Sequence, residues 1–310
     1  MKIHRLSDPY PKEKTVLTIG TFDGVHLGHQ KIIKRLLELA AKENLTPTLL
    51  TFFPHPKMVL QPDIGIKLLN TIEERKEILK SLGIEVLVIK TFDKKFADLS
   101  AEEYIENFLV QKLHAKCVVI GYDHHFGRER SAGIEELKKW SEIFQFKVEE
   151  ISAKDIDDVS ISSTKIRRAL ESGDIETANT FLGYEFFITG KVVQGRGIGK
   201  TIEFPTANIV IPEDYKIIPK RGVYVVKVQA ENSNYYGMMN IGNNPTVGGK
   251  KESLEVHLLD YDGNLYEKTL RIKFLERIRD EIKFDSIDEL KSQLHEDFEY
   301  TERFIKGLDE

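Results

Sequence analysis

The first half of the chain alternates short apolar segments with longer amphipathic ones. Apolar segments predict buried strands at residues 16–20, 48–53, 86–89, 117–121 and 146–151. Apolar residues at helical spacing predict helices near residues 28–42, 71–83, 100–113, 134–144, 163–171 and 175–182. Capping boxes at Thr71–Glu74 and Ser100–Glu103 mark two of the helix starts. Such alternation predicts an α/β fold, a parallel sheet with helices on both faces that binds ligands at the carboxyl ends of its strands.

The pattern changes near Gly183, where strand signals come closer together. Strands are predicted at residues 185–193, 222–229, 235–241, 253–260 and 270–278. A closing helix opens at the capping box Ser286–Glu289. This half therefore predicts an antiparallel β-barrel followed by a C-terminal helix. We place the domain boundary between residues 183 and 184, giving domains 1–183 and 184–310.

The composition of the chain argues against nucleic-acid binding and membrane insertion. The 310 residues are 41% hydrophobic and 31% charged, with a net charge of -5. A sizeable core is expected, but not the basic face that nucleic-acid binding needs. No run of about 18 apolar residues and no signal segment is present, which favours a cytoplasmic protein without a membrane partner. We expect small-molecule substrates and a monomer or weak homo-oligomer.

The single cysteine carries little chemistry. Cys117 excludes an internal disulfide and a cysteine-based zinc site. It lies inside a predicted strand, so packing is a better interpretation than a reactive thiol.

The segment from Gly20 to His29 has the features of a phosphate site. It follows the first strand and opens a helix, whose N-terminus offers free backbone N–H groups and a positive dipole end. Gly20 and Gly24 allow a tight turn, and Gly28 allows close approach of a ligand. His26 and His29, three residues apart, both face the same phosphate in this arrangement and stabilise charge that grows on its oxygens.

Two other interpretations of the histidine pair are open. His26 and His29 are solvated side chains at a helix start in the first, and metal ligands in the second. The metal interpretation is weaker because no nearby carboxylate completes a ligand set.

A second anion motif lies at the other end of this half, at residues 161–167. Its hydroxyls, from Ser162, Ser163 and Thr164, cap a helix and also suit phosphate oxygens. Arg167, one turn further on, reaches the same anion. A capped surface helix with a basic face is the alternative.

Together, GTFDGVHLGHQ and ISSTKIRRAL resemble the motifs of the nucleotidyltransferase superfamily, which implies a Rossmann-like domain. The intervening segments TFFPHP and GYDHHFG are similar to those of the adenylyltransferase module of bacterial FAD synthetases. The resemblance implies that His26 and His29 are catalytic. It implies ATP or phosphate contacts from Gly20, Phe22, Asp23, Gly28, Ser162, Ser163, Thr164 and Arg167. It implies flavin contacts from Phe53, Pro54, His55, Pro56 and Asp123.

The glycine-rich loop at residues 195–201 is similar in sequence to two nucleotide-binding motifs, the P-loop and the dinucleotide-binding fingerprint. Its Gly-Lys-Thr end is typical of a P-loop, but Gln194 stands where the first glycine belongs. No helix follows Thr201, which also excludes a dinucleotide fingerprint.

Followed by Pro205–Asn208, the same loop resembles the riboflavin kinase module of the same bifunctional family. The resemblance implies phosphate binding by Gly195, Gly197, Gly199, Lys200 and Thr206, and Mg²⁺ binding by Thr206 and Asn208. The strand at 254–260 matches the family's catalytic strand, with Glu255 as the base. From alternation alone, Glu255 is an ordinary exposed strand residue.

The resemblance predicts an enzyme of FAD biosynthesis. Its barrel phosphorylates riboflavin to FMN with ATP, and its α/β domain adenylylates FMN to FAD with release of pyrophosphate, both with Mg²⁺. Glu203 stands where the family usually has glycine, and a carboxylate is adverse in a phosphate loop. A monofunctional FMN adenylyltransferase with a flavin-binding barrel is therefore one alternative. A non-catalytic flavin-binding regulatory protein is another.

Overall fold

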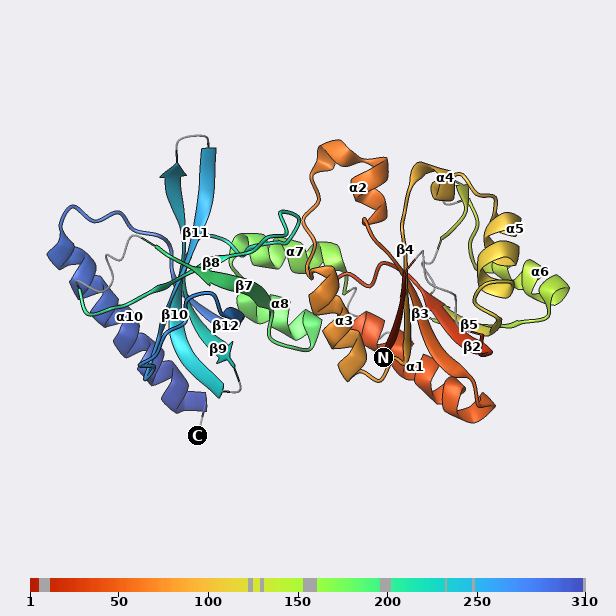
Figure 1. The fold of residues 1–310 in the computed structure, drawn as a ribbon, viewed down its shortest axis with the longest axis horizontal. Helices are drawn as coiled ribbons and strands as arrows, with labels where there is room; N and C mark the ends of the chain where they lie inside the picture. The colour runs from red at the N-terminus through yellow and green to blue at the C-terminus, as the bar shows by residue number, and fades with distance from the viewer. Residues whose placement is uncertain are drawn as a thin grey trace. The chain divides into compact units, whose positions relative to one another are not determined.

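The computed structural model describes residues 1–5, 12–121, 125–128, 131–152, 161–195, 202–231, 233–246 and 249–308. The chain forms two compact units, Met1–Ser163 and Thr164–Glu310. Figure 1 shows a helix-covered sheet in the first unit and a barrel in the second.

The sheet of the first unit is parallel throughout and has the strand order β1-β4-β3-β2-β5-β6. Its strands are β1 Lys2–Arg5, β2 Thr15–Ile19, β3 Thr46–Phe52, β4 Val86–Lys90, β5 Ala115–Gly121 and β6 Lys147–Ile151. The predicted parallel sheet is confirmed. The sequence pattern did not predict β1, because its four residues include only one large apolar side chain, Ile3.

The helices of the first unit are α1 Leu27–Glu43, α2 Pro56–Leu60, η1 Pro62–Ile64, α3 Ile72–Ser81, α4 Lys94–Ala97, α5 Ala101–Tyr104, η2 Ile105–Val110 and α6 Ile134–Phe144. Four of them, α1, α3, α5 and α6, begin close to predicted positions, whereas α2, η1 and α4 were not predicted. Both predicted capping boxes form, at Thr71 and at Ser100. The single helix expected over 100–113 is instead one turn of α-helix followed by the π-helical η2.

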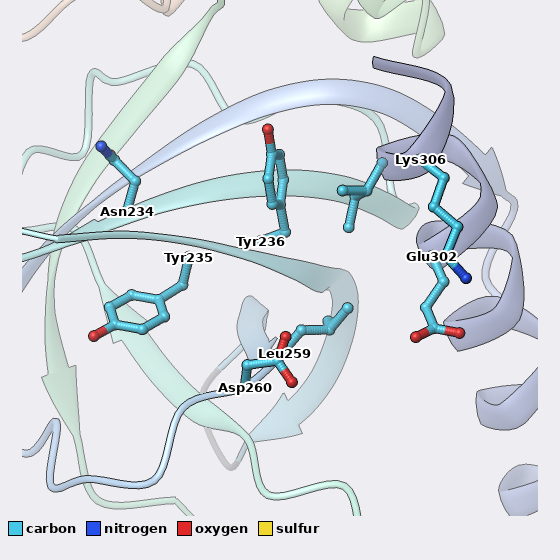
Figure 2. Close-up of a pocket in the computed structure, with 8 residues that line it drawn as sticks. Asn234, Tyr235, Tyr236, Leu259, Asp260, Glu302 and Lys306 are labelled. Atoms are coloured by element: carbon cyan, nitrogen blue, oxygen red, sulfur yellow. The ribbon is translucent and has the colours of Figure 1, made fainter. Parts of the chain in front are cut away.

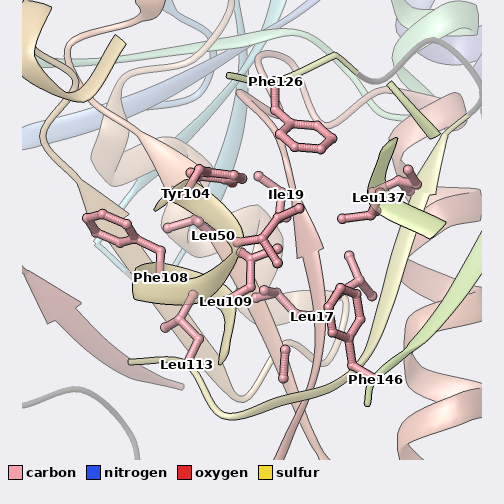
Figure 3. Packing of buried hydrophobic residues seen from close by; sticks show 14 of the residues in the cluster. Leu17, Ile19, Leu50, Tyr104, Phe108, Leu109, Leu113, Phe126, Leu137 and Phe146 are labelled. Atoms are coloured by element: carbon pink, nitrogen blue, oxygen red, sulfur yellow. The ribbon is translucent and has the colours of Figure 1, made fainter. Parts of the chain in front are cut away.

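Two apolar clusters cover the two faces of this sheet, because successive strand residues point to opposite faces. In β4, Leu87 and Ile89 pack with α1 and α3, whereas Val86 and Val88 pack with α5 and η2. Figure 3 shows the second cluster. The predicted packing position of Cys117 is confirmed, since it lies buried in the first cluster, and burial raises the pKa of its thiol to about 11.

The second unit contains a closed antiparallel barrel with the strand order β10-β11-β8-β7-β12-β9. Its strands are β7 Phe187–Val193, β8 Ala207–Val210, β9 Gly222–Ala230, β10 Ser233–Thr246, β11 Gly249–Leu258 and β12 Thr269–Arg279. Helices α7 Ser163–Ser172 and α8 Ile175–Leu182 precede it, and α10 Ile287–Leu308 follows it. The predicted barrel and closing helix are confirmed; β8, which follows a proline, was not predicted. Among the described residues, no helix is long and apolar enough to cross a membrane.

Candidate functional site

The turn between β2 and α1 holds an unusual backbone. Phe22 and Val25 have φ values of 47° and 38°, a left-handed region that disfavours residues with side chains. Gly24, with φ of 85°, is the residue type that this region accepts. Such strain persists only where the surrounding contacts hold it, and it is found most often at functional sites.

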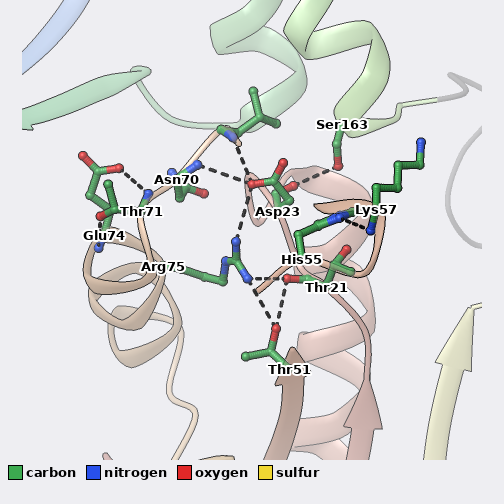
Figure 4. Close-up of polar contacts among 11 residues, drawn as sticks. Thr21, Asp23, Thr51, His55, Lys57, Asn70, Thr71, Glu74, Arg75 and Ser163 are labelled. Atoms are coloured by element: carbon green, nitrogen blue, oxygen red, sulfur yellow. Dashed lines mark hydrogen bonds and ion pairs between the residues drawn. The ribbon is translucent and has the colours of Figure 1, made fainter. Parts of the chain in front are cut away.

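Asp23 anchors this turn from within (Figure 4). Its fully buried carboxylate accepts hydrogen bonds from the backbone N–H of Leu69 at 2.9 Å and of Asn70 at 3.4 Å. Its Oδ1 also lies 3.6 Å from an Nη of Arg75. The structure therefore gives the Asp23 carboxylate structural partners inside the unit, and its predicted contact with ATP stays a prediction.

Arg75 of α3 is the residue that sequence reasoning missed. Its side chain is 1% exposed and donates to the carbonyl of Thr21 at 2.7 Å and to Thr51 Oγ1 at 3.4 Å. Thr51 donates to the same Thr21 carbonyl at 3.0 Å. Arg75 thus links the turn to the end of β3. The sequence offered little signal for it, since an arginine in an amphipathic helix is ordinarily exposed.

The two histidines lie against each other. The rings of His26 and His29 stack with centroids 3.7 Å apart, and His29 also contacts Phe22 at 4.9 Å. Burial, then the neighbouring charges of His26 and Arg75, lower the pKa of His29 well below its usual value. His29 is therefore a neutral imidazole near pH 7. Its Nδ1 is buried without a hydrogen-bond partner in the described part of the chain.

The N-terminus of α1 lies beside this pair. His26 is its N-cap residue and makes no side-chain hydrogen bond to the helix, and no acidic residue occupies the first turn. Gly28 is buried within that turn. Beside it, a side chain at Gly20 would press on the Phe22 ring, at 3.1 Å. The start of α1, with its positive dipole end, suits an anion.

One hydrogen bond joins the two predicted phosphate motifs. Ser163 Oγ donates to the carbonyl oxygen of Asp23 at 2.9 Å. Ser162, just before it, is half-buried. Thr164 is exposed and Arg167 half-buried on α7, which belongs to the second unit, so the structure brings Ser163 to the histidine turn without placing these two.

The proline–histidine segment leaves β3 beside the same turn. The peptide bond between Phe53 and Pro54 is cis. His55 is buried and caps α2, which begins at Pro56, by accepting a hydrogen bond from Lys57 N–H at 3.1 Å. Asp123, the other predicted flavin residue, lies outside the described residues.

The second unit gathers the predicted kinase residues. Thr206 Oγ1 donates to Glu255 Oε2 at 3.3 Å, and Glu255 pairs with Asn208 across β11 and β8. A side chain at Gly195 would collide with the Asn208 amide, since its Cβ would lie 2.0 Å from Nδ2. Gly195 is therefore required for this packing. Gly197, Gly199 and Lys200 lie outside the described residues.

Glu203 has a partner of its own. Its carboxylate lies 2.8 Å from Lys291 Nζ on α10, and the hydrogen bond from Lys291 lowers its pKa. The next residue, Phe204, contacts His257 and His295 edge-on at 5.3 and 5.1 Å. The carboxylate that is adverse in a phosphate loop is thus paired with a cation of α10.

The described residues offer a small set of oxygen donors for a metal ion. Among the described residues, no group of three or more His, Cys, Asp or Glu side chains could hold a metal. Thr206, Asn208 and Glu255 form a smaller set of hydroxyl, amide and carboxylate oxygens. Hard oxygen donors suit Mg²⁺, which usually keeps several waters.

A pocket of about 270 Å³ lies elsewhere in the barrel unit (Figure 2). Its lining residues are Asn234, Tyr235, Tyr236, Leu259, Asp260, Glu302, Ile305 and Lys306. None of the predicted site residues line it.

The chain matches two protein families in succession. Residues 8–165 match FAD synthetase and residues 182–305 match riboflavin kinase. A Listeria monocytogenes protein named bifunctional riboflavin kinase/FMN adenylyltransferase is 36% identical over 306 residues, covering 98% of this chain and 96% of its own. A protein of the same name from Escherichia coli (strain K12) is 38% identical over 307 residues, covering 99% and 97%.

A solved structure is similar over nearly the whole chain. It is described as a macrolide-efflux protein from Streptococcus pneumoniae, with a TM-score of 0.87, 33% identity, and coverage of 97% of this chain and 98% of that one.

Proposed function

Because this chain belongs to the family of bifunctional riboflavin kinases/FMN adenylyltransferases, we propose that the histidine turn is its adenylylation site and that Thr206, Asn208 and Glu255 form its kinase site. The protein is a transferase. It phosphorylates riboflavin to FMN with ATP, and it adenylylates FMN to FAD with release of pyrophosphate.

In the adenylylation step, a phosphate oxygen of FMN attacks the α-phosphorus of ATP, and the bond to pyrophosphate breaks. The attack increases negative charge on the phosphoryl oxygens in transit. His26 and His29 donate hydrogen bonds to these oxygens, together with the N–H groups at the start of α1. The neutral state of His29 suits this role, because it keeps one ring N–H to donate across neutral pH.

The remaining contacts of the adenylylation site fall into two groups, one for ATP and its phosphates and one for the flavin. ATP and phosphate contacts are assigned to Gly20, Phe22, Asp23, Gly28, Ser162, Ser163, Thr164 and Arg167. Flavin contacts are assigned to Phe53, Pro54, His55, Pro56 and Asp123. The hydrogen bond from Ser163 to Asp23 supports this grouping, because it links two motifs separated by 140 residues.

In the kinase step, the terminal ribityl hydroxyl of riboflavin attacks the γ-phosphorus of ATP, and the bond to ADP breaks. Glu255 takes the proton of that hydroxyl. The glycine loop at Gly195, Gly197, Gly199 and Lys200 holds the ATP phosphates with Thr206. The hydrogen bond between Thr206 and Glu255 supports placing the base beside the phosphate residue.

Mg²⁺ fits the oxygen donors of this unit. Thr206 and Asn208 would hold it, and it supplies charge neutralisation for the ATP phosphates when bound. The pairing of Asn208 with Glu255 and its closeness to Gly195 support this assignment.

Glu203 motivated the monofunctional alternative, and its ion pair with Lys291 removes that motive. With the carboxylate directed to α10, the loop carries no uncompensated negative charge at this position. A boundary at residue 183, a cytoplasmic location and a monomer or weak homo-oligomer remain predictions.

The stacked pair of His26 and His29 at the start of α1, with His29 neutral, carries the adenylylation assignment. The test is chromatography of the products formed from riboflavin, ATP and Mg²⁺. Wild type is expected to yield FMN and FAD, His29→Ala mainly FMN, and Glu255→Gln only FAD from supplied FMN. Loss of FMN formation in His29→Ala, or loss of FAD formation from supplied FMN in Glu255→Gln, would contradict two separate sites.

A further inference from the structure

Lys90 is a largely buried lysine that neither reaction step described above uses. It is the last residue of β4 and is only 8% exposed. Within the described part of the chain, its ammonium makes no hydrogen bond and no ion pair. It lies instead over the rings of Phe96 and Phe108, at 5.0 and 5.4 Å from their centroids. Lys90 Nζ is not among the fully buried polar atoms of the described residues, so the ammonium is accessible to solvent and to an incoming ligand.

Other charges compensate the Lys90 ammonium only in part. Burial lowers the pKa of Lys90, Asp93 acts in the opposite direction, and Lys112 lowers it further. Asp93 already accepts a hydrogen bond from Phe96 N–H at 2.7 Å, as the cap of α4. The two phenyl faces offer quadrupole attraction but no lone pair. The ammonium therefore keeps its hydrogen-bond donors for an incoming acceptor.

The surroundings of Lys90 suit a planar ligand. Phe52, Phe92 and Phe96 form a triangle of rings with centroids 5.6 to 5.8 Å apart. All three side chains are partly exposed. Partly exposed aromatic rings beside one polar group are typical of small-molecule sites, where apolar contacts hold the ligand and the polar group orients it.

Lys90 also lies at the ligand-binding edge of the sheet. It pairs with Phe52, so both residues stand at the carboxyl ends of adjacent parallel strands. Phe53 N–H donates to the Lys90 carbonyl at 3.1 Å, which joins β4 to the start of the proline–histidine segment. β4 is two strands from β2, or about 10 Å away at ordinary strand spacing. The ribityl phosphate of FMN can cover that separation.

We propose that Lys90 binds the flavin ring of FMN in the adenylylation site, by donating a hydrogen bond to a carbonyl oxygen of the pyrimidine edge. The ring packs against Phe52, Phe92 and Phe96, and the phosphate of the same FMN reaches the histidine turn. This assignment rests on the proposed function of that turn.

The test compares Lys90→Met with Lys112→Met in the full-length protein. Lys112 is a matched control, because its ammonium lies over the same Phe108 ring, at 4.4 Å, but on an exposed side chain. FAD formation from FMN and ATP gives kcat and the KM for FMN. Lumiflavin, which has the flavin ring without the ribityl phosphate, is added as an inhibitor of the same reaction.

Lys90→Met is expected to raise the KM for FMN and the inhibition constant of lumiflavin by a common factor, on the order of tenfold. It should leave kcat, the KM for ATP and riboflavin phosphorylation unchanged. Lys112→Met should change none of these, and Lys90→Arg should recover part of the loss. Lys90→Gln, which is polar and one atom shorter than lysine, serves if the Met variant does not fold.

An unchanged KM for FMN in a folded Lys90 variant would overturn the proposal. A raised KM for FMN with an unchanged lumiflavin constant would overturn the ring contact. Absence of FAD formation in the wild type would instead refute the proposed function.

Discussion

The hydroxyl of Ser163 donates a hydrogen bond to the backbone carbonyl of Asp23 at 2.9 Å. Ser163 begins α7, and Asp23 lies in the turn before α1. The contact joins the end of the first unit to the strained turn that presents the histidines. Ser163 thus has a structural contact in the protein without ligand, in addition to its proposed role toward phosphate.

Ser163→Ala should weaken adenylylation. The variant loses one hydrogen bond, worth about 1 kcal/mol, together with a hydroxyl at the phosphate site. We expect a lower kcat/KM for FAD formation and an unchanged rate of riboflavin phosphorylation. Ser163→Thr keeps the hydroxyl and is the matched control. Loss of both activities in the alanine variant would indicate general damage rather than a local role.

Arg75→Met should destabilise the first unit strongly. The substitution leaves the buried Asp23 carboxylate without its cation, a change that costs about 3 kcal/mol or more. Urea unfolding monitors the free energy of unfolding. The double variant Asp23→Asn/Arg75→Met should be less destabilised than the sum of the two single variants, because no charge is then left unpaired. Simple additivity would argue against an interaction between the two side chains.

The lowered pKa of His29 predicts a pH-dependent stability. The unfolded histidine binds a proton near pH 6.5, whereas the folded one stays neutral until well below that value. The contribution of His29 is therefore fully present above about pH 6.5 and is lost as the pH falls through the folded pKa. Wild type should lose more stability between pH 7 and pH 5 than His29→Asn does. Thermal unfolding at pH 7 and pH 5 measures these losses. If wild type and His29→Asn lost the same stability between the two pH values, the lowered pKa of His29 would be contradicted.

Glu203→Gly should keep kinase activity. Glu203 has a left-handed φ of 67°, which glycine accepts without strain, and its carboxylate is paired with Lys291 rather than free in the loop. We expect Glu203→Gly to unfold at a higher temperature than Glu203→Ala, and both to retain riboflavin phosphorylation. A large rise in kinase rate on removing the carboxylate would show that Glu203 opposes phosphate binding after all.

Tyr104→Phe should be neutral or stabilising, by up to about 1 kcal/mol. The Tyr104 hydroxyl is buried and has no hydrogen-bond partner among the described residues, and burial raises its pKa. Removing an unsatisfied polar group from an aromatic cluster costs no hydrogen bond. Chemical unfolding of the variant provides the measurement, and a clear loss of stability would reveal a partner for the hydroxyl.

The two-unit architecture could be predicted from local signals. Capping boxes at Thr71 and Ser100 formed as the sequence indicated, because both partners lie within four residues of each other. At Ser286 only half of the predicted box formed, since Glu289 N–H donates to the Ser286 hydroxyl while the Glu289 carboxylate accepts from Asp285 N–H. Competition between neighbouring backbone donors at a helix start is not visible in a spacing rule.

The resemblance of several segments to a known family pointed to flavin. By itself, the sequence determined most of the strands and helices, the change to a barrel, and the motifs that suit phosphate. These depend on apolar periodicity, turn residues and short spacings, which act between neighbours in the chain. Only the tertiary structure decided that Arg75 supports the Thr21 carbonyl, that Glu203 pairs with Lys291, and that Lys90 is buried among phenylalanines. Each of these joins residues from different elements, and the packing of elements sets such contacts, which no local pattern encodes.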